Sequence, residues 1–94
     1  MRLYELTVIL DAGIEDHKAV VEEIAEVVRG LEAEVEKVDH WGKKRLAYPI
    51  KKEQEGYYAM YTMKMPPEQL RELDRVLSLR TQVLRHLVVA TDEE

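Results

Sequence analysis

The sequence of 94 residues contains no cysteine, and this absence excludes several kinds of site. A disulfide framework, a thiolate-bound metal and a cysteine nucleophile all require that residue. No apolar run is long enough to cross a bilayer, and Arg2, Glu5 and Asp11 interrupt the first apolar stretch too early for a secretory signal. We therefore expect a cytoplasmic protein.

The sequence also has few residues that could carry catalysis or bind a metal. None of its three histidines (His17, His40 and His86) stands at a helical i, i+4 spacing from another. Ser78 is the only serine and lies among apolar residues, and no glycine-rich phosphate loop is present. We expect no enzyme activity, no metal site and no cofactor.

The length and composition are those of one globular domain, which we expect to span residues 1–94. The chain is 46% hydrophobic and 35% charged, so it has enough apolar side chains for a two-layer core. Its net charge is −5, but the charges are segregated: eleven of nineteen acidic residues precede residue 41, whereas residues 42–52 contain five basic residues and no acidic one. Such a protein would bind RNA weakly and would need a basic partner to release more counterions.

The hydrophobic periodicity predicts six elements in the order β-α-β-β-α-β. They are a strand at 2–10, a helix at 16–31, strands at 35–50 and 57–65, a helix from 66–68 to about 79–80, and a strand at 83–89. This order predicts an α+β, ferredoxin-like fold, in which a four-stranded antiparallel sheet carries two helices on one face. The other face of the sheet is expected to be bare.

Local details of the strands follow from single residues. Gly42 predicts a bulge or a bend, Pro49 predicts an edge strand or another bulge, and residues 51–56 are expected to connect two strands. Alternation assigns Tyr57, Ala59, Tyr61, Met63 and Met65 to the core. Both faces of the last strand are apolar, so the pattern does not tell which one faces the core.

The stretch from Gly42 to Tyr61 combines five cations with four of the five tyrosines. A hairpin with cations at its tip and rings along one strand suits an RNA or protein surface. The alternative is that the lysines simply protect a solvated sheet edge. Tyr58 and Met60 point away from the predicted core and Trp41 adjoins the cations, so all three are candidates for contact with a partner protein, unless they only pair across strands.

Several segments together resemble one known family. They are RLYEL at residues 2–6, GKKRLAYPI at residues 42–50 and Glu55-Gly56-Tyr57, followed by a helix that begins with proline. Over essentially the whole chain the sequence resembles the family of the sixth protein of the bacterial small ribosomal subunit. The resemblance implies a ferredoxin-like fold and a structural, non-enzymatic role in the ribosome. It also implies binding to the central domain of small-subunit ribosomal RNA, as a heterodimer with the small, basic eighteenth small-subunit protein.

The resemblance assigns RNA contacts to Arg2, Lys43, Lys44 and Arg45, with Lys51, Lys52 and Arg85 as secondary candidates. Leu84 stands where family members often carry a basic residue, which weakens the case for RNA contacts from the last strand. Tyr58, Met60 and Trp41 are assigned to the partner protein from their expected exposure alone.

Two other functions fit the same predicted fold. A stand-alone interaction or ligand-regulatory module would form homodimers through the open sheet face and would not bind RNA. An acylphosphatase-like enzyme would need an asparagine and an arginine around a phosphate-binding loop. The chain has no asparagine, and its first loop is acidic at Asp11, Glu15 and Asp16, so this enzyme is excluded.

Overall fold

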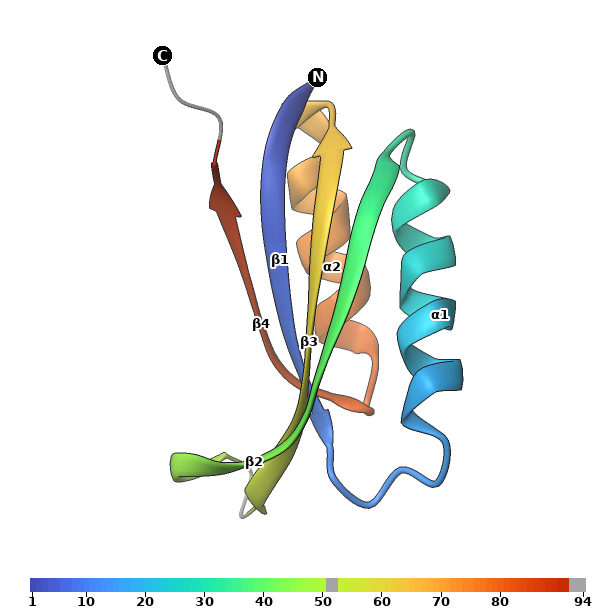
Figure 1. The fold of residues 1–94 in the computed structure, drawn as a ribbon. Coiled ribbons are helices and arrows are strands. Elements are labelled where there is room, and N and C mark those ends of the chain that lie inside the picture. Colours follow the sequence, from blue (N-terminus) through green and yellow to red (C-terminus); the bar gives the residue numbers. More distant parts are fainter. Residues whose placement is uncertain (51–52, 92–94) are drawn as a thin grey trace.

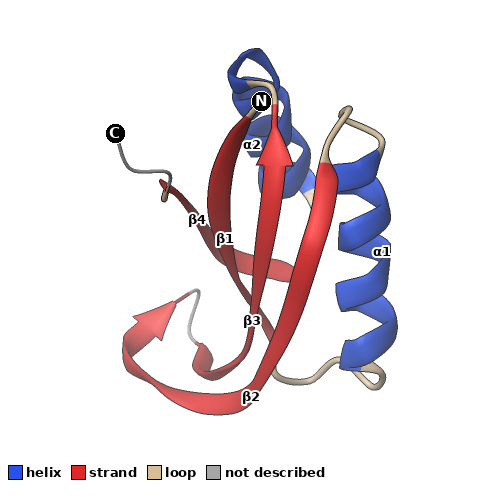
Figure 2. Cartoon of the chain, turned by 45° about the horizontal axis from the view of Figure 1, so that its top comes forward, coloured by secondary structure: helices blue, strands red, loops and turns tan. Residues whose placement is uncertain are grey.

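The computed structural model describes residues 1–50 and 53–91 and has the predicted α+β, ferredoxin-like architecture (Figure 1). Its elements are β1 (Arg2–Asp11), α1 (His17–Arg29), β2 (Glu34–Ile50), β3 (Glu53–Met65), a 3-10 turn (Pro67–Gln69), α2 (Leu70–Leu79) and β4 (Val83–Ala90). The four strands form one sheet in the order β2-β3-β1-β4, and every neighbouring pair is antiparallel. Both helices cover the same face (Figure 2).

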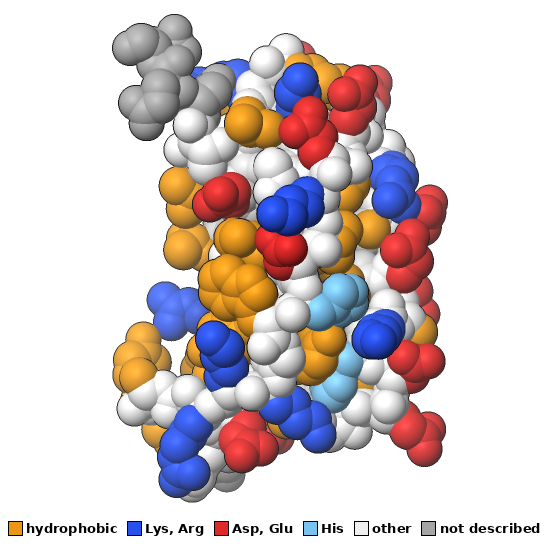
Figure 3. Space-filling model, viewed as in Figure 1, with side chains coloured by type: hydrophobic (Ala, Val, Ile, Leu, Met, Phe, Trp, Pro, Cys, Tyr) orange, Lys and Arg blue, Asp and Glu red, His pale blue; other side chains and the backbone are white. Residues whose placement is uncertain are grey.

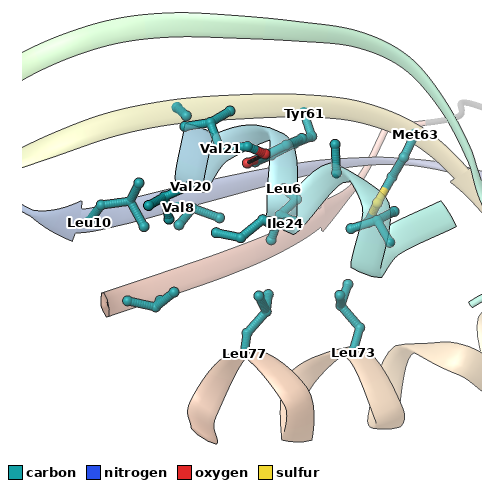
Figure 4. Close-up of a cluster of buried hydrophobic side chains, with 14 of the residues drawn as sticks. Leu6, Val8, Leu10, Val20, Val21, Ile24, Tyr61, Met63, Leu73 and Leu77 are labelled. Carbon is teal, nitrogen blue, oxygen red and sulfur yellow. Dashed lines mark hydrogen bonds between the residues drawn. The ribbon is translucent and has the colours of Figure 1, made fainter. Parts of the chain in front are cut away.

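The core lies between this face and the two helices, and the strand alternation supplies half of it (Figure 4). Every second residue of β1 is buried, from Tyr4 to Leu10, as is the alternating set from Ala59 to Met65 in β3. The helices contribute Val20, Val21, Ile24, Ala25, Val28, Leu73 and Leu77. The predicted core set of β3 is therefore confirmed, except that Tyr57 is half-buried.

Short polar and proline signals set the helix boundaries. The carboxylate of Asp16 caps α1 by accepting a hydrogen bond from the backbone N–H of Ala19 at 3.1 Å. The helix ends at Arg29, two residues before the predicted end, and Gly30 forms its C-cap. Pro67 begins the 3-10 turn that leads into α2, where its missing N–H costs nothing.

Gly56 does not belong to a connection, and the prediction of one over residues 51–56 is wrong for residues 53–56. β3 begins at Glu53, which pairs with Ile50, and Gly56 lies buried inside β3 between Asp11 and Lys44. A Cβ atom at residue 56 would clash with Cγ2 of Ile9. Glycine is needed here for close packing, not for a turn.

The predicted irregularities of β2 are confirmed. Its pairing with β3 shifts register between His40 and Gly42, and Gly42 has φ +85°, a left-handed conformation that favours glycine. Pro49 lies in the sheet's edge strand, where a further register shift separates Arg45 from Ile50.

The structure resolves the orientation of β4. A register shift beside Ile9 and Leu10 of β1 allows both Val83 and Leu84 to be buried. Beyond that point His86 and Val88 face the helices: His86 contacts Asp74 of α2, and Val88 packs against the core. Arg85, Leu87 and Val89 therefore lie on the sheet face turned away from the helices, called the open face below.

Candidate RNA and protein interface

Three consecutive cations, Lys43, Lys44 and Arg45, form the basic run of the edge strand β2. All three side chains are exposed, and none forms an ion pair with any residue that the structure describes. Alternation along the strand directs Lys44 to the open face and its two neighbours to the opposite side. Lys51 and Lys52, the other predicted hairpin cations, lie outside the described residues.

The end of the hairpin bends across the open face, so this face is not bare throughout as predicted (Figure 2). Leu46 is only 9% exposed because its side chain lies over Gly56 beside Ile9. The guanidinium Nη1 of Arg85 in β4 donates to the hydroxyl oxygen of Tyr48 at 3.1 Å. The two residues are 37 positions apart in the sequence, and their hydrogen bond brings Arg85 next to the hairpin.

Arg2 lies at the opposite end of the sheet from the basic run. It pairs with Met65, whereas Asp11, at the other end of β1, pairs with Gly56 beside Lys44. The ten residues of β1 span about 30 Å. The structure therefore does not bring Arg2 together with the other predicted RNA contacts.

Trp41, which is exposed, and Tyr58, which is half-exposed, form an aromatic pair on the open face, next to the basic run. Their ring centroids are 6.5 Å apart and their planes differ by 13°. The ammonium Nζ of Lys44 lies over the indole, 5.2 Å from its centroid. Trp41 is the residue left unpaired by the bulge, and it remains 46% exposed.

A second aromatic cluster lies on the helix side of the same strands, around Tyr57. The ring of His17 stacks on Tyr57 with centroids 4.2 Å apart, and His40 Nδ1 lies 2.9 Å from the Tyr57 hydroxyl. His17 Nε2 donates to the backbone oxygen of Asp11 at 2.9 Å. These contacts fix the start of α1 against the hairpin. Within the described residues no group of three potential metal-ligating side chains occurs.

The middle of the open face carries apolar side chains from β3 and β4 among polar and charged ones. The registers place Asp39, Met60, Thr7 and Leu87 in one cross-strand row, and Lys37, Thr62, Glu5 and Val89 in the next. Leu87 is 60% exposed and Val89 is 47% exposed. Sequence reasoning missed both, because β4 is apolar on both faces and no periodicity separates them.

The carboxylates on this face differ in their partners. Asp39 contacts the Lys37 ammonium at 3.7 Å, whereas Glu5, in the central strand β1, forms no ion pair with any described residue. The open face is thus cationic near the hairpin. In its central strand, the carboxylate of Glu5 has no ion-pair partner among the described residues. Figure 3 shows the same segregation more widely: acidic side chains follow α1, and Lys and Arg gather around the hairpin end.

Comparison with known proteins identifies a consistent set of relatives. A family model described as ribosomal protein S6 matches residues 3–90. The small ribosomal subunit protein bS6 of Corynebacterium efficiens is 47% identical, over 99% of this chain and 100% of its own length. The bS6 protein of Dictyoglomus turgidum is 40% identical, over 100% and 99% of the two chains.

The structural comparison agrees with the fold. The crystal structure of 30S ribosomal protein S6 from Thermotoga maritima matches with a TM-score of 0.89 and 24% identity, over 96% of this chain and 87% of that one. The P2 domain of the chemotaxis kinase CheA from the same organism matches with a TM-score of 0.57 and 17% identity, over 96% and 98% of the two chains. At these identities both likenesses concern the fold alone.

No helix within the described residues is long and apolar enough to span a membrane.

Proposed function

Because this chain belongs to the ribosomal protein S6 family, we propose that it binds the central domain of small-subunit ribosomal RNA as a heterodimer with the eighteenth small-subunit protein. Membership itself makes the chain a structural, non-enzymatic protein of the small ribosomal subunit, which in bacteria is cytoplasmic. In this proposal residues 1–94 act as one domain that holds RNA and protein together.

The observation that carries the proposal is the cluster of exposed cations at the hairpin end, of which Lys44 lies on the open face. At the hairpin end, Lys43, Lys44 and Arg45 are exposed and lack carboxylate partners among the described residues, so binding phosphates would break no ion pair. Such cations position a protein on RNA and gain affinity by releasing counterions. Arg85 adds a cation next to them, and Arg2 would reach only RNA that runs the length of the domain.

A basic partner protein fits the other half of the open face. Met60, Leu87 and Val89 offer apolar area there, and the carboxylate of Glu5 can pair with a cation from the partner. A net charge of −5 favours the same association. Tyr58 and Trp41, which the sequence groups with Met60, lie at the cationic end, so a basic partner reaches them only by approaching Lys44.

The first test measures binding to a central-domain RNA fragment over a salt series, with and without the partner protein. We expect tight, salt-sensitive binding only when both proteins are present. Arg45→Ala should weaken this binding. It should also make the negative slope of log K against log salt shallower by about 1.

Arg75→Ala is the matched control, because it removes the same charge from an exposed position on α2, away from the open face. It should leave the slope unchanged. If Arg45→Ala instead lowers the melting temperature at unchanged salt slope, Arg45 has a structural role. A wild-type homodimer that binds no RNA would favour the stand-alone module.

A further inference from the structure

The backbone around Trp41 is built to present the indole. Trp41 occupies the bulge between His40 and Gly42, and Gly42 takes up the left-handed φ of +85° that the bulge requires. A bulge redirects a side chain relative to the regular pleat. Here it leaves the largest side chain of β2 nearly half exposed and parallel to Tyr58.

The charges around this pair select its ligand. Lys44 lies over the indole, whereas Lys43 and Arg45 of the same strand point to the other side of the sheet. Arg85 and Tyr58 both pair with Ile9, from opposite sides of β1, so Arg85 lies in the same cross-strand row. A basic protein would be repelled here, whereas a nucleotide supplies both an anion and an aromatic ring.

We propose that the Trp41–Tyr58 pair is a stacking platform for one unpaired nucleobase of the ribosomal RNA. The inference rests on the proposed function and narrows it, because it assigns these two residues to RNA and leaves Met60 to the partner protein. The base stacks on the indole, and the flexible side chain of Lys44 moves from the ring to the adjoining phosphate. Unpaired bases in loops and bulges are the part of RNA that is accessible to such stacking.

Trp41 is the only tryptophan in the chain, so its fluorescence reports directly on the platform. The partner protein and then the RNA fragment are added to the wild-type chain, and the same mixtures with Trp41→Leu serve as blanks. We expect the partner alone to leave the emission maximum unchanged and the RNA to quench the emission. A blue shift with the partner alone, or a ternary complex without quenching, would overturn the inference.

Two substitutions separate stacking from a merely apolar contact. Trp41→Phe keeps a ring and should stay within a few-fold of the wild-type Kd for RNA, whereas Trp41→Leu should raise that Kd by about fivefold or more. Equal affinities for wild type and Trp41→Leu would refute the platform while leaving the proposed function intact. If wild type forms no complex with RNA and partner, the proposed function fails and this inference fails with it.

Discussion

At the scale of single residues, Tyr61 is the clearest case of a buried polar atom with its partner. The residue is fully buried, and its hydroxyl donates to the backbone oxygen of Val21 in α1 at 2.8 Å. This hydrogen bond joins β3 to α1 through the core, beside Ile24 and Leu6 (Figure 4). Burial also raises the pKa of the Tyr61 hydroxyl well above its ordinary value, because the phenolate would lose its hydration.

We predict that Tyr61→Phe lowers the free energy of unfolding by about 1 kcal/mol at neutral pH, the typical value of one hydrogen bond. The pKa is raised in the folded state, so the contribution is complete below the unfolded pKa near 10 and declines as pH rises above it. Wild type should therefore lose its advantage over Tyr61→Phe in alkaline solution. Urea unfolding at about pH 7 and about pH 11 measures both effects.

Tyr58→Phe is the matched control for this prediction, since Tyr58 lies on the opposite face of the same strand and is half-exposed. Removing the Tyr58 hydroxyl should change the free energy of unfolding little at either pH. If Tyr61→Phe keeps the full wild-type stability at neutral pH, the prediction is wrong. The hydrogen bond to Val21 would then be no more favourable than the hydration of the hydroxyl in the unfolded chain.

Local sequence patterns predict this core, but they do not predict the structural role of every glycine. Alternation in β3 identifies Tyr61 and Met63 as buried because the period of 2 is a local property. Gly56 could not be assigned in the same way. The reason it must be glycine is the side chain of Ile9, 47 positions earlier, and in sequence a polar segment with glycine is typical of a turn.

At the scale of elements, the β2–β3 hairpin shows how far local signals reach. Gly42 and Pro49 predict the bulge and the edge position, since both follow from backbone chemistry at one residue. The bend of the hairpin end across the open face depends instead on Leu46 over Ile9 and on Tyr48 with Arg85. Neither contact has a sequence signature, so the predicted bare face is partly covered.

We predict that the Tyr48–Arg85 hydrogen bond holds the hairpin end in this bent position. Both side chains are exposed, so Tyr48→Phe and Arg85→Ala should each change the global free energy of unfolding by less than about 1 kcal/mol. Backbone amides of residues 45–48 and of Ile50 should exchange with solvent faster in either variant, because this segment opens locally.

The double variant tests whether the two residues act together. If the hydrogen bond is the shared cause, Tyr48→Phe adds nothing to the exchange rates of Arg85→Ala. Additive effects would mean that the two side chains hold the hairpin independently. Tyr58→Phe, on the next strand, should leave exchange in residues 45–50 unchanged.

At the scale of the whole molecule, a small acidic domain is divided between two kinds of surface. The domain measures 36 × 25 × 21 Å, and Lys44 of its basic run lies on the same sheet face as the row that contains Met60 and Leu87. Charge counts along the sequence predict the segregation, because eleven of the nineteen acidic residues precede residue 41 and none lies within residues 42–52. They do not predict the row itself, which requires β4 to lie beside β1 with Leu87 outward.

A comparison of two exposed leucines tests whether the partner protein binds the open face. Leu87 on the open face is 60% exposed, and Leu79 at the end of α2 is 68% exposed, so neither contributes much to the core. Leu87→Ala should raise the Kd for the partner protein by about 5- to 30-fold, as expected for an apolar contact worth 1–2 kcal/mol. Leu79→Ala should stay within about twofold of wild type.

Isothermal titration calorimetry of each variant with the partner protein measures these constants, and a thermal melt checks that both remain folded. Equal losses for the two leucines would place the partner elsewhere. If sedimentation shows that wild type alone is a dimer and Leu87→Ala is a monomer, the open face joins two copies of this chain. A monomeric wild type with a loss confined to Leu87→Ala would assign the part of that face around Leu87 to the partner, next to the cations that we propose as RNA contacts.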